Sequence, residues 1–150
     1  MADEHLRLEN QLCFSVYATA REITKLYRPL LEELNVTYPQ YLVLLVLWEE
    51  DRLTVKELGH RLYLDSGTLT PMLKRMEQAD YLQRIRSKED ERVVVVTLTE
   101  KGRAARKQAN DIPHLLLDHI DVDPDELSQM KGTLMKVLQS VHVKNGDTKA

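Results

Sequence analysis

The chain has 150 residues, 43% of them hydrophobic and 30% charged, and this balance excludes a disordered chain and a fibre. Its longest apolar run, residues 42–48, is far shorter than the roughly 20 residues of a membrane-spanning helix, and its polar start leads us to expect no signal peptide. The net charge of −3 gives no overall attraction to nucleic acid, so any DNA binding must depend on where individual charges lie.

The first third of the chain is predicted to be helical. Apolar side chains recur every three or four positions in residues 5–28, which predicts a helix that is buried on more than one side. Pro29 is expected to interrupt or kink this helix. After a break at residues 35–37, Pro39 suits a first helical turn, and the apolar run that follows predicts a central core helix over residues 39–50.

Two short helices separated by a tight turn are predicted next. Thr54 and Glu57 have the spacing of a capping box, which predicts a helix that ends near Tyr63. Asp65 offers an N-cap for a second helix over residues 66–79. One face of this second helix is apolar and is expected to face the core, with Leu69, Met72, Leu73 and Met76. Its other face is small, hydroxylated and basic, with Ser66, Thr68, Thr70, Lys74 and Arg75.

A hairpin is predicted after these helices, because the periodicity changes to two. Residues 81–86 and 92–98 are rich in β-branched side chains and alternate like strands, and the polar residues 87–91 form the loop between them. Two helices, a tight turn and a hairpin predict a mainly α fold with a small β-hairpin wing, which is a winged helix-turn-helix.

The rest of the chain is predicted to be helical. Thr99 is expected to cap a long helix that reaches about residue 119 and is bent or broken near Pro113. Asp123 at an N-cap, with Pro124 in the first turn, predicts a last helix. The buried face of this last helix is expected to contain Leu127, Met130, Leu134, Leu138 and Val141.

A winged helix-turn-helix of this composition suits double-stranded DNA. Small hydroxylated side chains on the second helix fit a major groove, and Lys74 and Arg75 reach further. An arginine at a wing tip suits the negative potential of a narrow minor groove. The basic residues expected to line the outer surface of the hairpin are Arg84, Arg86, Lys88 and Arg92. The residues alone leave an alternative open, because solvated helical pairs and protein-binding modules share these features.

Several segments resemble a known family of regulators. Residues 69–77 (LTPMLKRME) and 90–92 (DER), followed by a valine-rich strand and Leu98-Thr99, resemble the DNA-binding core of the multiple antibiotic resistance regulator (MarR) family. Residues 8–14 (LENQLCF) and 38–41 (YPQY) are similar to the organic hydroperoxide resistance regulator (OhrR) subgroup. The resemblance covers nearly the whole chain.

The resemblance implies a single MarR-type chain over residues 1–150 that forms an intertwined homodimer. It implies dimerisation helices within residues 1–36 and 112–145 and a DNA-binding region over residues 53–99. The second helix of the pair would read the major groove and Arg92 the minor groove, and the dimer would repress transcription at a pseudo-palindromic operator. The candidate DNA-contacting residues are Asp65, Ser66, Thr68, Thr70, Lys74, Arg75, Arg84, Arg86, Lys88, Asp90 and Arg92.

Cys13 is the single cysteine, which excludes an intrachain disulfide and a thiolate-only zinc site and favours a reducing, cytoplasmic compartment. From the residues alone it is a small buried hydrophobe on the apolar stripe of the first helix. Glu9 lies four residues before it and disfavours a thiolate, and the predicted helix start is too distant for the helix dipole to help. The five histidines lack metal-ligand spacing, so no metal or other cofactor is expected.

The resemblance implies a different role for Cys13. In the subgroup, the matching cysteine senses organic hydroperoxides, and tyrosines that match Tyr27 and Tyr38 hydrogen-bond to it. Tyr27 lies 14 residues further along the same predicted helix, which is roughly 21 Å along the axis. Its phenol must therefore reach Cys13 of the other subunit, whereas Tyr17 can approach Cys13 within the chain.

The expected chemistry is attack of the Cys13 thiolate on a hydroperoxide, which gives a sulfenic acid. Because the chain has no second cysteine, a mixed disulfide with a low-molecular-weight thiol, or further oxidation, should follow. This is stoichiometric sensing, so no enzyme activity is expected. Two alternatives stay open: a family member that responds to a small phenolic or acidic ligand, and a thiol peroxidase that uses Cys13 catalytically.

Overall fold

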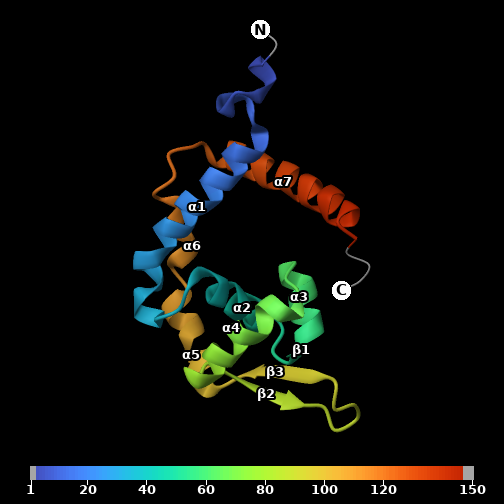
Figure 1. Ribbon diagram of the computed structural model, residues 1–150. Coiled ribbons are helices and arrows are strands. Elements are labelled where there is room, and N and C mark those ends of the chain that lie inside the picture. The colour runs from blue at the N-terminus through green and yellow to red at the C-terminus, as the bar shows by residue number, and fades with distance from the viewer. Residues whose placement is uncertain (1–2, 147–150) are drawn as a thin grey trace.

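Seven α-helices and a small sheet make up the computed structural model, which describes residues 3–146 (Figure 1). Two 3-10 turns, Glu4–Leu6 and Leu8–Asn10, come first, and a third, Glu32–Leu34, follows the first helix. The helices are α1 Leu12–Leu31, α2 Tyr38–Glu49, α3 Val55–Leu62, α4 Ser66–Gln78, α5 Glu100–Ala109, α6 Ile112–Leu117 and α7 Pro124–Lys144. The strands are β1 Leu53–Thr54, β2 Leu82–Arg86 and β3 Val94–Leu98. None of the described helices is both long and apolar enough to cross a membrane.

Side-chain caps begin most of the helices, as the sequence predicts. Asp65 accepts a hydrogen bond from the Thr68 amide at 2.7 Å, and Thr54 accepts one from the Glu57 amide at 3.0 Å. Thr99 and Asp123 cap α5 and α7 in the same way. The reciprocal capping box, however, lies at Thr37 and Gln40 of α2, because the Thr54 hydroxyl donates to the Glu57 carboxylate instead.

The first helix differs from the prediction at both ends. Asn10 and Gln11 donate their side-chain amides to backbone carbonyls of residues 4, 5 and 7, and these bonds stabilise 3-10 turns in place of a helix before Leu12. At the other end, α1 continues through Pro29 to Leu31. Pro29 lies on the exposed side of the helix, where water can pair with the carbonyl that it leaves free.

The sheet has three antiparallel strands in the order β1-β3-β2, whereas the sequence predicted two. In the hairpin, Arg84 pairs with Val96 and Ile85 with Val95. The additional strand, β1, has two residues, with Leu53 opposite Val96, and is too short to show a periodicity. The long helix expected after Thr99 is broken near Pro113, as predicted, into α5 and α6.

A continuous core joins α2, α3, α4, α5 and the inner face of the sheet. The predicted inner face of α4 is confirmed, because all four of its apolar residues are buried. The Trp48 indole donates to the Gly102 carbonyl at 2.9 Å, and the Tyr81 hydroxyl donates to the Leu34 carbonyl. The first bond joins α2 to α5, and the second joins the winged unit, residues 53–98, to the 3-10 turn after α1.

An extensive apolar surface lies outside this core. No side chain of α7 is buried, so the predicted burial of its apolar face is wrong for a single chain. The first half of α1 is equally open, with Leu12 72% exposed. In Figure 1, α7 begins at the same end of the molecule as the start of α1 and runs towards the side of α3, where the rings of His142 and Tyr63 are 4.7 Å apart. We name as the terminal apolar surface the exposed residues Leu6, Leu8, Leu12, Phe14, Val16, Tyr17, Leu115, Leu117, Val122, Met130, Leu134, Met135, Val137, Val141 and Val143.

Candidate functional site

The turn between α3 and α4 places the polar face of α4 outward. Gly59 permits this turn, because a Cβ there would lie 2.6 Å from the Leu64 carbonyl oxygen. Tyr63 ends α3 in the left-handed conformation, with φ 58°, and Asp65 then caps α4. Hydrogen bonds from the Thr68 backbone and side chain lower the pKa of Asp65, so this cap is ionised at neutral pH. The predicted contact residues on α4 are all exposed: Ser66, Thr68, Thr70, Lys74 and Arg75.

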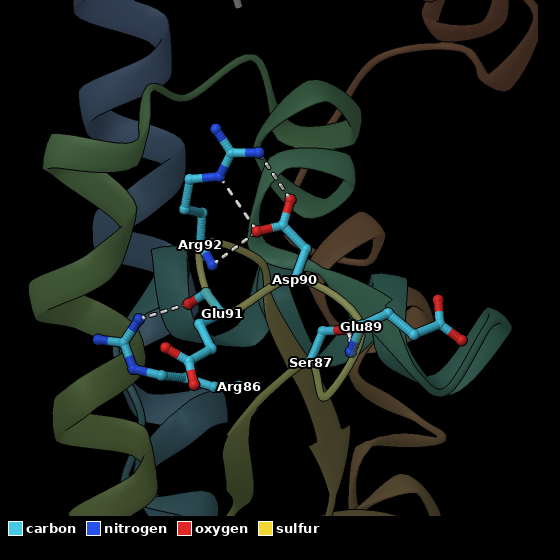
Figure 2. A network of polar contacts seen from close by, with 6 residues as sticks. All are labelled: Arg86, Ser87, Glu89, Asp90, Glu91 and Arg92. Atoms are coloured by element: carbon cyan, nitrogen blue, oxygen red, sulfur yellow. Dashed lines mark hydrogen bonds and ion pairs between the residues drawn. The ribbon is translucent and has the colours of Figure 1, made fainter.

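The wing loop holds Arg92 in a defined position. Asp90 accepts hydrogen bonds from the Arg92 backbone amide at 3.0 Å and from its guanidinium at 3.1 Å, as Figure 2 shows. These bonds also lower the pKa of Asp90. The Arg92 side chain is still 90% exposed. Arg86 donates to the Glu91 carbonyl at 2.9 Å, and Lys88 is exposed beside it. A guanidinium fixed by a neighbouring carboxylate loses less conformational entropy when it meets a ligand.

Arg84 does not line the outer surface of the hairpin as the sequence predicted. Its guanidinium contacts the Glu77 carboxylate of α4 at 3.1 Å, and its backbone amide donates to the same carboxylate at 2.9 Å. The side chain is only 25% exposed. The backbone bond is the largest contribution to a lowered pKa of Glu77. Arg84 therefore joins the wing to α4, so the two elements that are expected to contact DNA are linked directly.

Arg52 is a cation that sequence reasoning missed. It lies between α2 and β1 with φ 87°, a conformation that non-glycine residues rarely adopt. With Arg86 and Lys88 it lines a hollow of about 440 Å³ on the wing. The preceding Asp51 accepts from the Leu98 amide at 2.9 Å and from Arg103 at 3.1 Å, which fixes this turn. No pattern in the sequence marks the turn, because both of Asp51's partners lie more than 45 residues away.

Cys13 is exposed in the first turn of α1, which corrects two expectations from the sequence. It is not buried in the single chain, and it is not remote from the helix start. The unpaired amides and the positive end of the helix dipole favour an anion in this turn. Glu9, which was expected to oppose a thiolate, is paired with Arg7 at 3.2 Å. Tyr17, one turn further along, has Arg21 over its ring.

The other predicted tyrosines form a cluster at the far end of α1. The rings of Tyr27 and Tyr38 are 4.5 Å apart, and Tyr41, which the sequence did not single out, lies 5.7 Å from Tyr27. Burial, with smaller contributions from the two neighbouring phenols, raises the pKa of Tyr27 to about 12. Burial likewise raises the pKa of Tyr38. Both hydroxyls are therefore protonated at neutral pH and can donate hydrogen bonds.

Cys13 and this tyrosine cluster cannot meet within one chain. Both Cys13 and Tyr27 belong to the continuous helix α1, so about 21 Å of helix separates them. A site that contains the cysteine and both phenols therefore needs two chains. Among residues 3–146, no group of three histidine, cysteine, aspartate or glutamate side chains is placed to hold a metal ion.

The chain is similar to known transcription regulators over most of its length. The family model described as transcriptional regulator SarA/Rot matches residues 25–109. The organic hydroperoxide resistance transcriptional regulator of Bacillus subtilis (strain 168) is 55% identical over 142 residues, which cover 95% of this chain and 97% of that protein.

Solved structures of similar proteins include DNA complexes. Reduced AbfR bound to DNA has a TM-score of 0.80 and 37% identity, over 94% of this chain and 96% of that one. For AbfR, a protein of Staphylococcus epidermidis, the overoxidized form bound to DNA gives a TM-score of 0.76 and the disulfide form 0.61.

A mutant MarR from E. coli, complexed with operator DNA, is more distant. It has a TM-score of 0.73 and 27% identity, over 85% of this chain and 93% of that one. The matching family model covers more than half of the chain, and the relatives cover almost all of it. The chain therefore belongs to the MarR/SarA family of transcriptional regulators.

Proposed function

We propose that this protein is a dimeric repressor that binds a pseudo-palindromic operator and releases it when an organic hydroperoxide oxidises Cys13. The observation that carries the proposal is the position of Cys13, exposed in the first turn of α1 and surrounded by the terminal apolar surface. The 55% identical relative is named for organic hydroperoxide resistance, which agrees with this role.

DNA binding is supported by the exposed face of α4 and by the wing. AbfR and MarR, which align with most of this chain, were solved with DNA. In the proposed complex, α4 enters the major groove and Arg92 reaches the adjacent minor groove. Two copies related by a twofold axis would read half-sites about one helical turn apart or slightly more.

The terminal apolar surface supports the homodimer. Complete burial of a single large apolar side chain contributes about 1.5–3 kcal/mol. Fifteen such side chains are exposed on this surface. Single exposed apolar residues are normal on a monomer, but a group of this size marks an interaction surface. A partner chain that covers α7 and the start of α1 also brings its tyrosine cluster towards Cys13.

Substitution of Leu134 by aspartate tests the dimer. The side chain is 40% exposed in the single chain. The substitution would bury an unpaired carboxylate in the dimer interface, which costs several kcal/mol, and the twofold symmetry would repeat this cost in the second subunit. We expect monomers in sedimentation velocity at concentrations where the unmodified protein is dimeric. Ile85→Asp is the matched control, because Ile85 is 51% exposed but lies on the wing. Equal dimerisation of the Leu134 variant and the control would contradict the proposed interface.

The proposed chemistry has two steps. The Cys13 sulfur attacks a hydroperoxide oxygen, the O–O bond breaks, and the alcohol leaves with a proton, which yields a sulfenic acid. A small thiol then displaces the sulfenic oxygen as water and forms a mixed disulfide. Since an overoxidized relative was solved bound to DNA, we assign release to the mixed disulfide and not to overoxidation.

The experiment that tests the function measures release from DNA with cumene hydroperoxide and a small thiol. A fluorescent duplex selected by the protein from a random pool reports binding by anisotropy, and intact mass identifies the adduct on the released protein. We expect release only when both reagents are present, with one thiol per Cys13. Steady consumption of excess hydroperoxide and thiol would favour a peroxidase, and release by a phenolic acid without oxidation would favour a ligand sensor.

A further inference from the structure

A cavity of about 370 Å³ lies beside the tyrosine cluster, between the second half of α1 and the loop that leads into α2. Its volume is within the range of about 300–1,000 Å³ that is usual for small-molecule sites. The polar residues that line it are Thr24, Arg28, Glu32, Asn35, Thr37 and Tyr38. Tyr38 connects it to the cluster, because the Tyr38 ring packs against that of Tyr27 with a tilt of 38° and centroids 4.5 Å apart.

Two opposite charges line the cavity without engaging each other. Arg28 lies in the last turn of α1 and Glu32, four residues on, begins the 3-10 turn that follows it, and both are exposed. In the described part of the chain neither makes an ion pair or a side-chain hydrogen bond, although Lys25 and Glu22 on the same helix are paired at 3.0 Å. An arginine that precedes a glutamate by four residues is the weaker order for a helical ion pair. Both charged groups are therefore available to a ligand.

The spacing of these charges fits one kind of ligand. Side chains one turn apart on a helix have Cβ atoms about 5–6 Å apart, and the head group of an α-amino acid carries a carboxylate and an ammonium on one carbon. Arg28 can bind the carboxylate through two parallel hydrogen bonds, and Glu32 can accept from the ammonium. Asn35 also lines the cavity and adds a side-chain amide.

We propose that this cavity binds the amino-acid head group of the thiol that forms the mixed disulfide with Cys13 of the partner subunit. The inference rests on the proposed function, and it names the substrate class of the second step. The thiol sulfur attacks the sulfenic sulfur, an S–S bond forms, the S–O bond breaks, and the oxygen leaves as water after it gains a proton. The hydroperoxide has already supplied the oxidation. The Tyr27 and Tyr38 hydroxyls can donate hydrogen bonds to the departing oxygen.

Four thiols that differ in charge test this assignment. Cysteine carries both charges, 3-mercaptopropionate only the carboxylate, cysteamine only the ammonium, and 2-mercaptoethanol neither. The full-length dimer is first oxidised with one equivalent of cumene hydroperoxide, and the rate of mixed disulfide formation is then followed by quenched intact mass. Each rate is expressed as the ratio of variant to unmodified protein, so that the intrinsic reactivity of each thiol cancels. The variants are Arg28→Gln, Glu32→Gln and the control Lys25→Gln.

The expected pattern has opposite signs for the two variants. With cysteine, both variants slow the reaction about tenfold, because each loses one charged hydrogen bond. With 3-mercaptopropionate, Arg28→Gln slows the reaction and Glu32→Gln accelerates it, and with cysteamine these effects are reversed. With 2-mercaptoethanol, no variant changes the rate by more than about twofold. Lys25 lies outside the cavity, so Lys25→Gln changes the rate with each of the four thiols by no more than about twofold.

Two kinds of result would overturn the inference. Equal effects of a variant on all four thiols, or an unchanged rate with cysteine, mean that the cavity does not recognise the head group. If the sulfenic acid forms normally but reacts at a rate that does not depend on the charge of the thiol, this inference is wrong and the proposed function is unaffected. If hydroperoxide yields no sulfenic acid on Cys13, the proposed function fails, and the inference fails with it.

Discussion

Replacement of Cys13 by serine is expected to leave operator binding unchanged and to abolish release by hydroperoxide. The hydroxyl keeps the size of the side chain and its exposed position in the first turn of α1, so neither the fold nor the face of α4 changes. A serine hydroxyl does not ionise at neutral pH and does not reduce a hydroperoxide. Anisotropy of the labelled operator should therefore stay constant at concentrations of hydroperoxide and thiol that release the unmodified protein completely.

Ser15→Ala is the matched control for this variant. Ser15 is also exposed near the start of α1 but carries no sulfur, so its variant should respond like the unmodified protein. A Cys13→Ser protein that still leaves the operator after hydroperoxide treatment would refute the proposed switch. A Cys13→Ser protein that fails to bind the operator at all would instead show that the cysteine has a structural role.

Arg92→Ala is expected to produce the largest loss of operator affinity among the wing residues. The guanidinium is 90% exposed and is fixed by Asp90 in the conformation shown in Figure 2. A specific arginine contact is worth about 1–3 kcal/mol, and the proposed dimer has two wings. The affinity for the operator should therefore fall by about 30-fold or more. Titration of a labelled operator by anisotropy at two salt concentrations measures the change.

Arg106→Ala removes the same charge from an exposed position near the end of α5, outside both α4 and the wing. Its effect on the affinity should be small, since exposed charges further away than a Debye length of about 8–10 Å are screened. Equal losses for the two variants would mean that Arg92 contributes only to the general field of the protein. In that case Arg92 would not be a minor-groove contact.

The helices and their caps could be predicted from the sequence because their causes are local. Asp65 lies three residues before the amide that it caps, and the buried face of α4 follows from a spacing of three and four residues. The start of α1 was predicted wrongly because the amide side chains of Asn10 and Gln11 compete with helical bonds. Hydrophobic periodicity contains no information about such bonds.

The candidate site could be predicted only in part. The residue types on α4 and in the wing indicate DNA binding, but no pattern shows that Arg84 pairs with Glu77 instead of facing solvent. The distance of Cys13 from the start of the helix depends on where that helix begins. The predicted start was seven residues too early, so Cys13 was wrongly expected to lie far from it. The neighbours of Tyr41 and Arg52 depend on tertiary packing, which a single sequence does not display.

The bonds between Arg84 and Glu77 restrict how oxidation of Cys13 would affect α4 and the wing, the two elements proposed to read DNA. Because the wing is held to α4 by a backbone and a side-chain contact, neither element can be displaced alone without breaking both. In the proposed dimer, a disturbance at Cys13 would then rotate each winged unit as a rigid body and change the distance between the two units. Since a duplex accepts only one such separation, modification of a single cysteine per dimer should suffice to detach both halves together.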